Sequence, residues 1–309
     1  MLRKLILLAV VAGIIGLAIF WFVTIPATVP ASALGAYKPD LANGKILFYA
    51  GGCASCHATP GQDDKTKLGG GFPLHSPFGT FYAPNISMDP KAGIGNWTEH
   101  QFVNAVLKGT SPDGSHYFPA FPYSSYHFMS LSDVRDLFAH MKTLPATPDV
   151  SKAHDVPFPF SVRRPLGGWK FLFFDDSTFK PDTTKSAEWN RGAYLVNGPG
   201  HCAECHSPRN ILGGIKSGQR FAGAPNPEGK GWVPNITQKG GLAEWSVSDI
   251  AYFLETGQTP DGDTAGGSMA RVIRNTSQLS AEDRASMAEY LKSLPPVEGP
   301  PRPKKAKSG

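Results

Sequence analysis

Two five-residue stretches of the sequence carry residue types that can do chemistry: CASCH at 53–57 and CAECH at 202–206. In each, two cysteines lie three positions apart and a histidine follows directly. Two thiols about one helical turn apart can bond to the two vinyl groups on one side of a porphyrin. The adjacent histidine then lies under the ring, where its imidazole can bind iron. The pattern predicts two covalent haem c groups, attached by Cys53 and Cys56 and by Cys202 and Cys205, with His57 and His206 as iron ligands.

Three other interpretations of the paired cysteines explain less of the pattern. A thioredoxin-like C-x-x-C pair needs a βαβ setting and no histidine beside it. A zinc site built from all four cysteines would leave both histidines unexplained. A disulfide within each pair is the third alternative, since exported proteins often pair their cysteines. Two complete copies with no spare cysteine favour haem attachment.

The sequence around the two motifs is repeated. NGKILFYAGG precedes the first motif and RGAYLVNGPGH precedes the second, and each has the pattern of a short apolar helix. Downstream, PNIS at 84–87 corresponds to PNIT at 234–237. A tryptophan, a helix and a Pro-Asp-Gly turn then follow in each copy. The repeat predicts two similar helical units of about 100 residues, a usual domain size.

Helix-end signals recur in both copies as well. Each tryptophan precedes a capping box and, twelve residues on, a glycine suited to a left-handed helix end. Each copy closes with a helix that ends in Leu-Pro and has a serine as its expected N-cap. These positions are Trp97, Thr98 with Gln101, Gly109 and Ser132 in the first copy, and Trp245, Ser246 with Asp249, Gly257 and Ser280 in the second.

Both copies resemble class I cytochrome c domains. The whole chain resembles the membrane-anchored dihaem cytochromes c related to the cytochrome subunits of quinoprotein alcohol dehydrogenases. The resemblance covers residues 40–296, and PAFPY at 119–123 and GGSMARVIRNT at 266–276 are its more specific marks. It implies an all-α fold with two tandem class I cytochrome c domains after an N-terminal transmembrane helix. We expect a membrane anchor at 1–30, a first domain at 38–147, an aromatic-rich bridge at 148–187, a second domain at 188–297 and a basic tail at 298–309.

The sixth iron ligand is expected to differ between the two haems. Cytochrome c iron usually takes a methionine thioether or a second imidazole opposite its histidine. Met269, eight residues after the aspartate of the second Pro-Asp-Gly, is the candidate in the second copy. Phe121 occupies that position in the first copy, where similar subunits often have PAMPY, and a phenyl ring cannot bind iron.

Three side chains near Phe121 could replace the missing ligand. Met129 would keep His/Met ligation, and we favour it. His127 or His116 would give a haem of lower potential. The remaining possibility is that aromatic residues close off the ring and leave the iron five-coordinate.

The N-terminus has the pattern of a membrane anchor. Arg3 and Lys4 precede an uncharged apolar run from Leu5 to Val23, long enough to cross a bilayer core of roughly 30 Å as a helix. Positively charged residues that flank a membrane helix stay on the cytoplasmic side, so we expect the rest of the chain in the periplasm, anchored to the bacterial inner membrane. The alternative is a cleaved signal peptide with a small-residue site near residues 31–33.

The bridge and the tail differ in composition. FPFSVRRPLGGWKFLFFDD at 158–176 is rich in aromatics, which we expect to bury themselves across both domains. Arg163 and Arg164 in it are candidate partners for haem propionates, although we favour the interpretation that they are solvated charges of a linker. The tail is basic and rich in proline, typical of a solvated chain end.

These features predict an electron-transfer protein and not an enzyme: a membrane-tethered dihaem cytochrome between a periplasmic dehydrogenase and a terminal oxidase or another cytochrome. The rival is a dihaem oxidoreductase, of peroxidase or thiosulfate dehydrogenase type, with an open or displaceable ligand at the first haem. A zinc-binding structural module is a third hypothesis. The net charge is only +5 and no basic stripe is interleaved with aromatics, which argues against a nucleic-acid partner.

Overall fold

The computed structural model describes residues 1–229 and 231–302, and their secondary structure is mostly helical. We call residues 38–147 the first half and residues 188–297 the second half. The elements before the bridge are α1 Leu2–Val23, η1 Ala31–Ala33, α2 Leu41–Ala50, α3 Cys53–His57, β1 Pro73–Ser76, β2 Gly79–Tyr82, α4 Glu99–Lys108, α5 Tyr123–Tyr126 and α6 Leu131–Met141. The elements from the bridge onward are α7 Leu166–Phe173, α8 Ala187–Asn197, α9 Ala203–His206, η2 Ser217–Gln219, β3 Ala224–Pro225, β4 Trp232–Val233, η3 Gly241–Ala243, α10 Val247–Thr256, α11 Gly267–Thr276 and α12 Ala281–Lys292.

Each half is organised around one helix pair. α2 packs on α6, and α8 packs on α12. A glycine lies at each crossing, because a Cβ atom on Gly44 would overlap the backbone oxygen of Asp136, and one on Gly192 would overlap that of Ser286. Glycine therefore lets the two backbones of each pair approach closely, in the same way in both halves.

The predicted helix ends of α4 and α10 are confirmed. Thr98 and Gln101 form a reciprocal capping box, and so do Ser246 and Asp249. Gly109 ends α4 with φ 58°, and the glycine at 257 ends α10 with φ 76°. Both values lie in the left-handed region, where an L side chain would be strained.

The N-cap predicted for α6 is wrong by two residues. Ser130, and not Ser132, caps the helix, because its hydroxyl accepts a hydrogen bond from the Asp133 backbone N–H at 3.0 Å. Ser132 lies within the first turn. Ser280 caps α12 as predicted and accepts the corresponding bond three residues on, at 3.1 Å.

Short antiparallel strand pairs replace part of the expected loop after each cysteine motif. β1 pairs with β2, with Leu74 opposite Phe81, and β3 pairs with β4. β2 also bonds to the bridge, since the backbone groups of Thr80 and Asp155 exchange hydrogen bonds of 2.8 and 2.9 Å. The sequence did not predict these strands, which are too short to show an alternating pattern.

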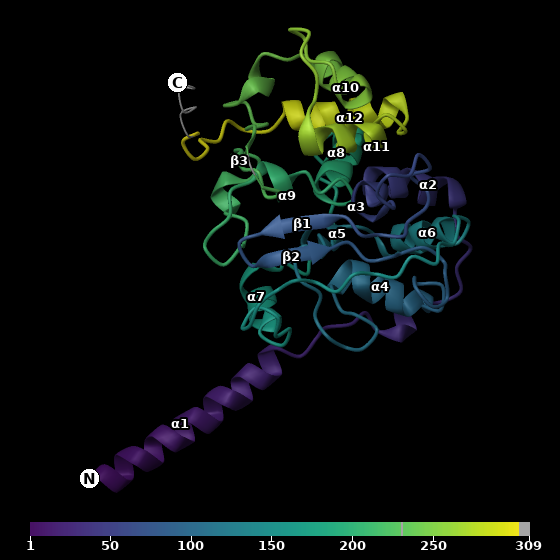
Figure 1. The fold of residues 1–309 in the computed structure, drawn as a ribbon. Helices are drawn as coiled ribbons and strands as arrows, with labels where there is room; N and C mark the ends of the chain where they lie inside the picture. Colours follow the sequence, from purple (N-terminus) through teal and green to yellow (C-terminus); the bar gives the residue numbers. More distant parts are fainter. Residues whose placement is uncertain (230, 303–309) are drawn as a thin grey trace, which may run out of the picture.

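The two halves share one hydrophobic core. Its buried members include Leu47, Val103 and Val134 of the first half and Leu195 and Ile250 of the second. Figure 1 shows the second half, in green and yellow, packed over the first half, in blue and teal. The halves are therefore held at a fixed separation by apolar packing.

The helix α1 extends away from this body, and none of its residues is buried (Figure 1). It is long and apolar enough to cross a membrane. Its C-terminal end is bonded at Thr24 to the first half and to the bridge. The Thr24 carbonyl accepts a hydrogen bond from His116 Nε2 of the first half at 3.0 Å, and its hydroxyl accepts one from Arg164 Nε of the bridge at 2.8 Å. Arg164, a candidate partner for a haem propionate, thus bonds to the end of α1.

The bridge contacts both halves. Lys170 Nζ donates to the backbone oxygens of Lys108 and Gly109 at 2.6 and 2.8 Å, at the end of α4. Trp169 Nε1 donates to the Leu212 oxygen of the second half at 2.9 Å. The expectation that its aromatics all bury themselves is wrong, since Phe171 on the outer face of α7 stays exposed. A helix of eight residues can bury only one face against the body.

The beginning of the predicted tail packs on the second half. The Glu298 backbone oxygen accepts a hydrogen bond from Gln219 Nε2 at 3.1 Å, and the Glu298 carboxylate lies 3.5 Å from Lys239 Nζ. The remainder of the tail prediction, at 303–309, lies outside the described residues.

Candidate haem sites

Each cysteine motif ends in a histidine whose ring is held in the same way. His57 Nδ1 donates to the Pro84 backbone oxygen at 2.7 Å, and His206 Nδ1 donates to the Pro234 oxygen at 2.8 Å. Such a bond fixes the tautomer and the ring orientation, and it leaves Nε2 as the free ligand atom. Burial lowers the pKa of both histidines, although each proline carbonyl acts in the opposite direction, so the rings are neutral and able to bind a metal.

The loops that supply the two carbonyls are also built alike. The side-chain oxygen of Asn85 accepts a hydrogen bond from the Ser87 backbone N–H at 2.8 Å, and Asn235 does the same for Thr237. These are the PNIS and PNIT segments of the sequence repeat. The asparagine therefore shapes the turn that presents the proline oxygen to the histidine.

All four cysteines are unpaired thiols in the structure. Burial raises the pKa of Cys53 and Cys205 to about 12 and the pKa of Cys56 and Cys202 to about 11. A redox-active pair uses a thiolate with a lowered pKa, so these surroundings do not fit such a pair. Among the residues that the structure describes, no three His, Cys, Asp or Glu side chains converge as a metal site would require.

The residues present fit a covalent porphyrin. In both motifs the cysteines and the histidine are partly exposed, whereas adjoining residues such as Leu47, Phe48 and Ala203 are buried. The donor set is a pair of neutral thiols with one oriented imidazole, repeated twice. These are the groups that thioether attachment and iron ligation need.

The PAFPY segment lies beside the first cysteine pair. Tyr126 donates from its hydroxyl to the Gly51 oxygen at 3.0 Å, and its pKa is raised by burial and by the nearby Cys53 and Cys56. The Phe121 ring packs edge-on against Tyr126, with centroids 5.7 Å apart. An aromatic pair therefore borders the first site where the sequence repeat would place a methionine.

Met269 lies in the first turn of α11, in a helix where the sequence indicated a loop. Its side chain is partly exposed and packs against the shared core. Gly267, two residues before it, has φ 56° and permits the turn into the helix. Met287, the other methionine near the C-terminus, is buried in α12, as its place in the sequence indicated.

The three substitute ligands proposed for the first haem have different surroundings. His116 donates to Thr24 at the end of α1, and His127 Nδ1 donates to the Ser177 oxygen of the bridge at 2.7 Å. Met129 is 1% exposed, in the core, with its Cγ near Gly198 of the second half. The two histidines thus have polar partners, that of His116 at the end of α1 and that of His127 in the bridge, whereas Met129 lies in the apolar core.

The two halves also bond to each other through their cysteine motifs. Ser55 and Glu204 occupy the same position, the second residue between the cysteines. Glu204 accepts hydrogen bonds from Ser124 and Ser125 of the first half at 2.9 and 2.8 Å and pairs with Arg209 at 2.5 Å. The second motif therefore contacts the segment of the first half that lies between Phe121 and Met129.

The reciprocal contact involves Ser55 and α11. The Ser55 hydroxyl donates to the Arg271 backbone oxygen at 3.3 Å and accepts from Asn275 Nδ2 at 2.9 Å. The guanidinium of Arg271 also lies 4.6 Å from the centroid of the Phe72 ring in the first half. Ser55 and Glu204 were not predicted to take part; their only signal in the sequence is that they are the polar residues inside the two motifs.

Comparison with known proteins agrees with this geometry. Residues 41–145 match the family described as Cytochrome c. The chain is 46% identical over 293 residues to a "Diheme cytochrome c-type" protein of Cereibacter sphaeroides, and the match covers 94% of this chain and 97% of that protein. This chain belongs to the cytochrome c family. Members of this family carry haem c and transfer electrons, so the prediction that the chain is not itself an enzyme is confirmed.

Two cytochrome subunits of dehydrogenases are also similar to this cytochrome. The fructose dehydrogenase cytochrome subunit of Gluconobacter japonicus is 38% identical over 271 residues. The cytochrome c subunit of the quinone alcohol dehydrogenase of Gluconobacter oxydans is 36% identical over 279 residues. Each match covers 86% of this chain, and 54% and 57% of the respective subunit, so this cytochrome spans just over half their length.

The carboxylate of Glu204 is expected to contribute to the stability of this cytochrome. Burial raises its pKa, but Arg209, Ser125 and Ser124 outweigh that effect and hold the pKa below its ordinary value. Glu204→Gln should reduce the free energy of unfolding by about 1–3 kcal/mol, the usual cost of an unsatisfied buried polar group. Denaturant unfolding followed by the Soret band measures this change.

The effect of this substitution should depend on pH. Because the folded-state pKa is lowered, the carboxylate's contribution is present above the unfolded value of about 4.3 and is lost as pH falls further. The difference between wild type and variant should therefore shrink in acid. Glu244→Gln, at an exposed glutamate, is the matched control. A difference that stayed constant down to pH 3 would contradict this account of Glu204.

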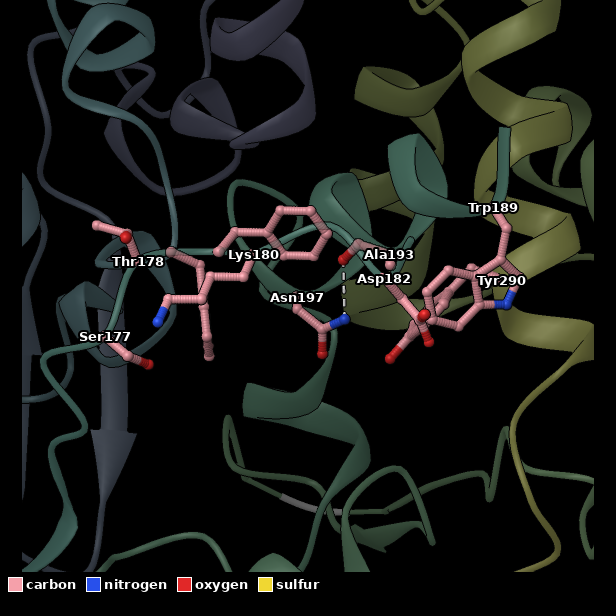
Figure 2. A pocket seen from close by; sticks show the side chains of 10 residues that line it. Ser177, Thr178, Lys180, Asp182, Trp189, Ala193, Asn197 and Tyr290 are labelled. Atoms are coloured by element: carbon pink, nitrogen blue, oxygen red, sulfur yellow. Dashed lines mark hydrogen bonds between the residues drawn. The ribbon is translucent and has the colours of Figure 1, made fainter. Parts of the chain in front are cut away.

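A pocket of about 460 Å³ lies apart from the cysteine motifs, between the bridge, α8 and α12. Figure 2 shows Trp189 and Tyr290 on one side of it and Ser177 and Lys180 toward the other. Asn197 Nδ2 donates to the Ala193 oxygen at 2.8 Å in its wall. No residue of CASCH or CAECH lines it, so it is not where the sequence predicts haem.

Proposed function

We propose that this cytochrome is a dihaem electron relay built from two tandem cytochrome c domains, at 38–147 and 188–297. The observation that carries the proposal is the repeated pair of cysteine motifs with identically oriented histidines. When bound, haem iron changes between its ferric and ferrous states and so carries one electron. Cys53 and Cys56 would hold the first haem, and Cys202 and Cys205 the second.

The protein's own residues set the position and potential of these groups. His57 and His206 would bind iron through Nε2, because Nδ1 of each is engaged by a proline oxygen. Met269 would supply the sixth ligand of the second haem. For the first haem we keep Met129 as the proposed ligand, because its thioether would preserve His/Met ligation. The alternatives are His127, which Ser177 engages through Nδ1 only, and His116, which Thr24 engages through Nε2 only.

Fixed spacing between the two sites supports a relay, because electron tunnelling falls steeply with distance. The shared core and the bonds of Ser55 and Glu204 hold the two cysteine motifs together. Ser55 and Glu204 stand at the same position of the two motifs, so each motif is hydrogen-bonded to the other half through the same position. The spacing would then stay the same as electrons pass.

For location, we propose a single-pass protein of the bacterial inner membrane with both haem domains in the periplasm. The charged residues Arg3 and Lys4 before the apolar part of α1 support this orientation. The donor would be a periplasmic dehydrogenase, since the similar subunits named above belong to dehydrogenases. The acceptor would be a terminal oxidase or another cytochrome.

Optical and EPR spectra of the intact protein test the relay against an enzyme. Phe121 beside the first cysteine pair is the observation that favours the rival, a dihaem oxidoreductase. A relay predicts six-coordinate low-spin iron at both sites and full reduction without a bound substrate. High-spin iron that responds to peroxide or cyanide at the first site would favour the oxidoreductase.

Met129→Ala tests the proposed ligand of the first haem. The near-infrared band of thioether-bound iron should disappear for the first haem and remain for the second, since only one sulfur is removed. Met141→Ala is the matched control, because that methionine is equally buried in the first half. An unchanged band in the Met129 variant would remove Met129 from the site.

A further inference from the structure

Large apolar side chains remain exposed on one side of the body. Phe171 and Leu172, on the outer face of α7, are 74% and 62% exposed. Exposed apolar patches of this kind mark contact with a membrane or another protein. We call the set the α7 patch; it consists of Phe158, Phe160, Phe171, Leu172, Ile211 and Leu212.

The members of the α7 patch come from three segments that touch one another. The ring of Phe160 packs against Phe78, with centroids 5.3 Å apart, and Phe78 in turn lies against Gly213. Trp169 of α7 donates to the Leu212 oxygen. The 158–160 loop, α7 and the 211–212 turn thus form a continuous surface.

The α7 patch adjoins the end of α1. Arg164, just before α7, donates to the Trp21 oxygen at 2.7 Å, and its guanidinium lies 4.3 Å from the centroid of the Trp21 ring. Gly167 of α7 approaches Thr24 so closely that a Cβ atom would not fit. Figure 1 shows α7 at the point where α1 meets the body, while α10 and α12 lie on the opposite side.

We propose that the α7 patch lies in the interfacial layer of the bilayer that α1 crosses, and that it fixes the orientation of the haem domains on the membrane. The inference rests on the proposed anchoring by α1. Trp21 and Phe22 end the apolar helix at the depth where aromatic residues favour the membrane interface. Because Arg164 and Gly167 hold α7 against that end, the patch is kept near the same depth, where its apolar area would bind lipid.

Photo-crosslinking of the full-length holoprotein in nanodiscs of phosphatidylglycerol and phosphatidylethanolamine tests this contact. p-Benzoylphenylalanine is placed at position 171 in the patch, at position 15 in α1 or at position 252 in α10. Tyr252, in α10, is a matched aromatic that is 51% exposed, and α10 lies on the side of the body away from α7 (Figure 1). We expect lipid adducts at 15 and 171 and none at 252.

The three positions separate the possible failures. Adducts at position 15 without adducts at position 171 would contradict lipid contact of the α7 patch and still support membrane anchoring by α1. The loss of adducts at both would contradict the proposed anchoring itself. In native membranes, adducts of position 171 with a protein and not with lipid would overturn the proposal in favour of a partner subunit.

A second measurement does not depend on the cross-linker. Soret linear dichroism in oriented bilayers should show a preferred haem orientation in the wild type. Phe171→Glu with Leu172→Glu should abolish that orientation while haem content stays unchanged, since both side chains are exposed. Tyr252→Glu should preserve it. An unchanged dichroism in the double variant would overturn the proposal.

Discussion

Replacing Met269 with histidine is expected to lower the reduction potential of the second haem by roughly 0.1–0.3 V, part of the ~0.8 V range that axial ligands span. A thioether stabilises ferrous iron more than an imidazole does, so His/Met haems have higher potentials. Met269 is partly exposed in the first turn of α11, so a polar side chain of similar size can be accommodated there. A redox titration followed by optical spectra measures the shift.

A neighbouring methionine provides the control for this substitution. Met287 is buried in α12, and Met287→Leu conserves volume in a packed core. It should leave both potentials and the near-infrared band unchanged. If Met269→His left the potential of the second haem where it was, Met269 would not be its ligand.

Replacing Cys202 and Cys205 together with serine is expected to remove one of the two covalent haems and leave the other. Thioether attachment needs both thiols of a motif, while the first motif is untouched. The pyridine haemochrome absorbance per chain should therefore fall by half. The electron-accepting capacity in a reductive titration should fall equally.

The mirrored variant, Cys53→Ser with Cys56→Ser, makes this test specific. It should also halve the haem content, but the haem that remains should keep the spectrum assigned to Met269. Because both haems are proposed to have His/Met ligation, the near-infrared thioether band should remain in each variant. Its absence in the Cys202 and Cys205 variant would contradict Met129 as the ligand of the first haem. Full haem content in either variant would contradict attachment at that motif.

The helix ends could be predicted because their signals are local. Thr98 with Gln101 and Ser246 with Asp249 lie within one turn, and the glycine after each helix needs no partner from elsewhere. The error at α6 shows the limit of such signals. Ser130 and Ser132 both offer a hydroxyl, and the structure uses the one that reaches the Asp133 N–H.

The contacts between the halves could not be predicted from local patterns. Glu204 bonds to Ser124 and Ser125, about 80 positions earlier, and Ser55 bonds to α11, more than 200 positions later. The sequence around Ser55 and Glu204 does not indicate which residues they bond to. Docking of the two halves brings these residues together.

The bridge shows a different limit. Its aromatic composition indicated burial, and Phe173 and Phe174 do pack against the body. Phe171 does not, because α7 presents only one face to the protein, and Phe158 in the loop before α7 is exposed as well. Composition alone does not distinguish a surface covered by protein from one that would be covered by lipid.

The most direct test of the account is to count covalent haem on the wild-type protein made in a host competent for cytochrome c maturation. Intact mass under denaturing conditions and the pyridine haemochrome spectrum give the number independently. The account predicts a mass equal to the polypeptide plus two haem groups and a haemochrome ratio of two per chain. A mass equal to the bare polypeptide, with no haemochrome spectrum, would contradict it.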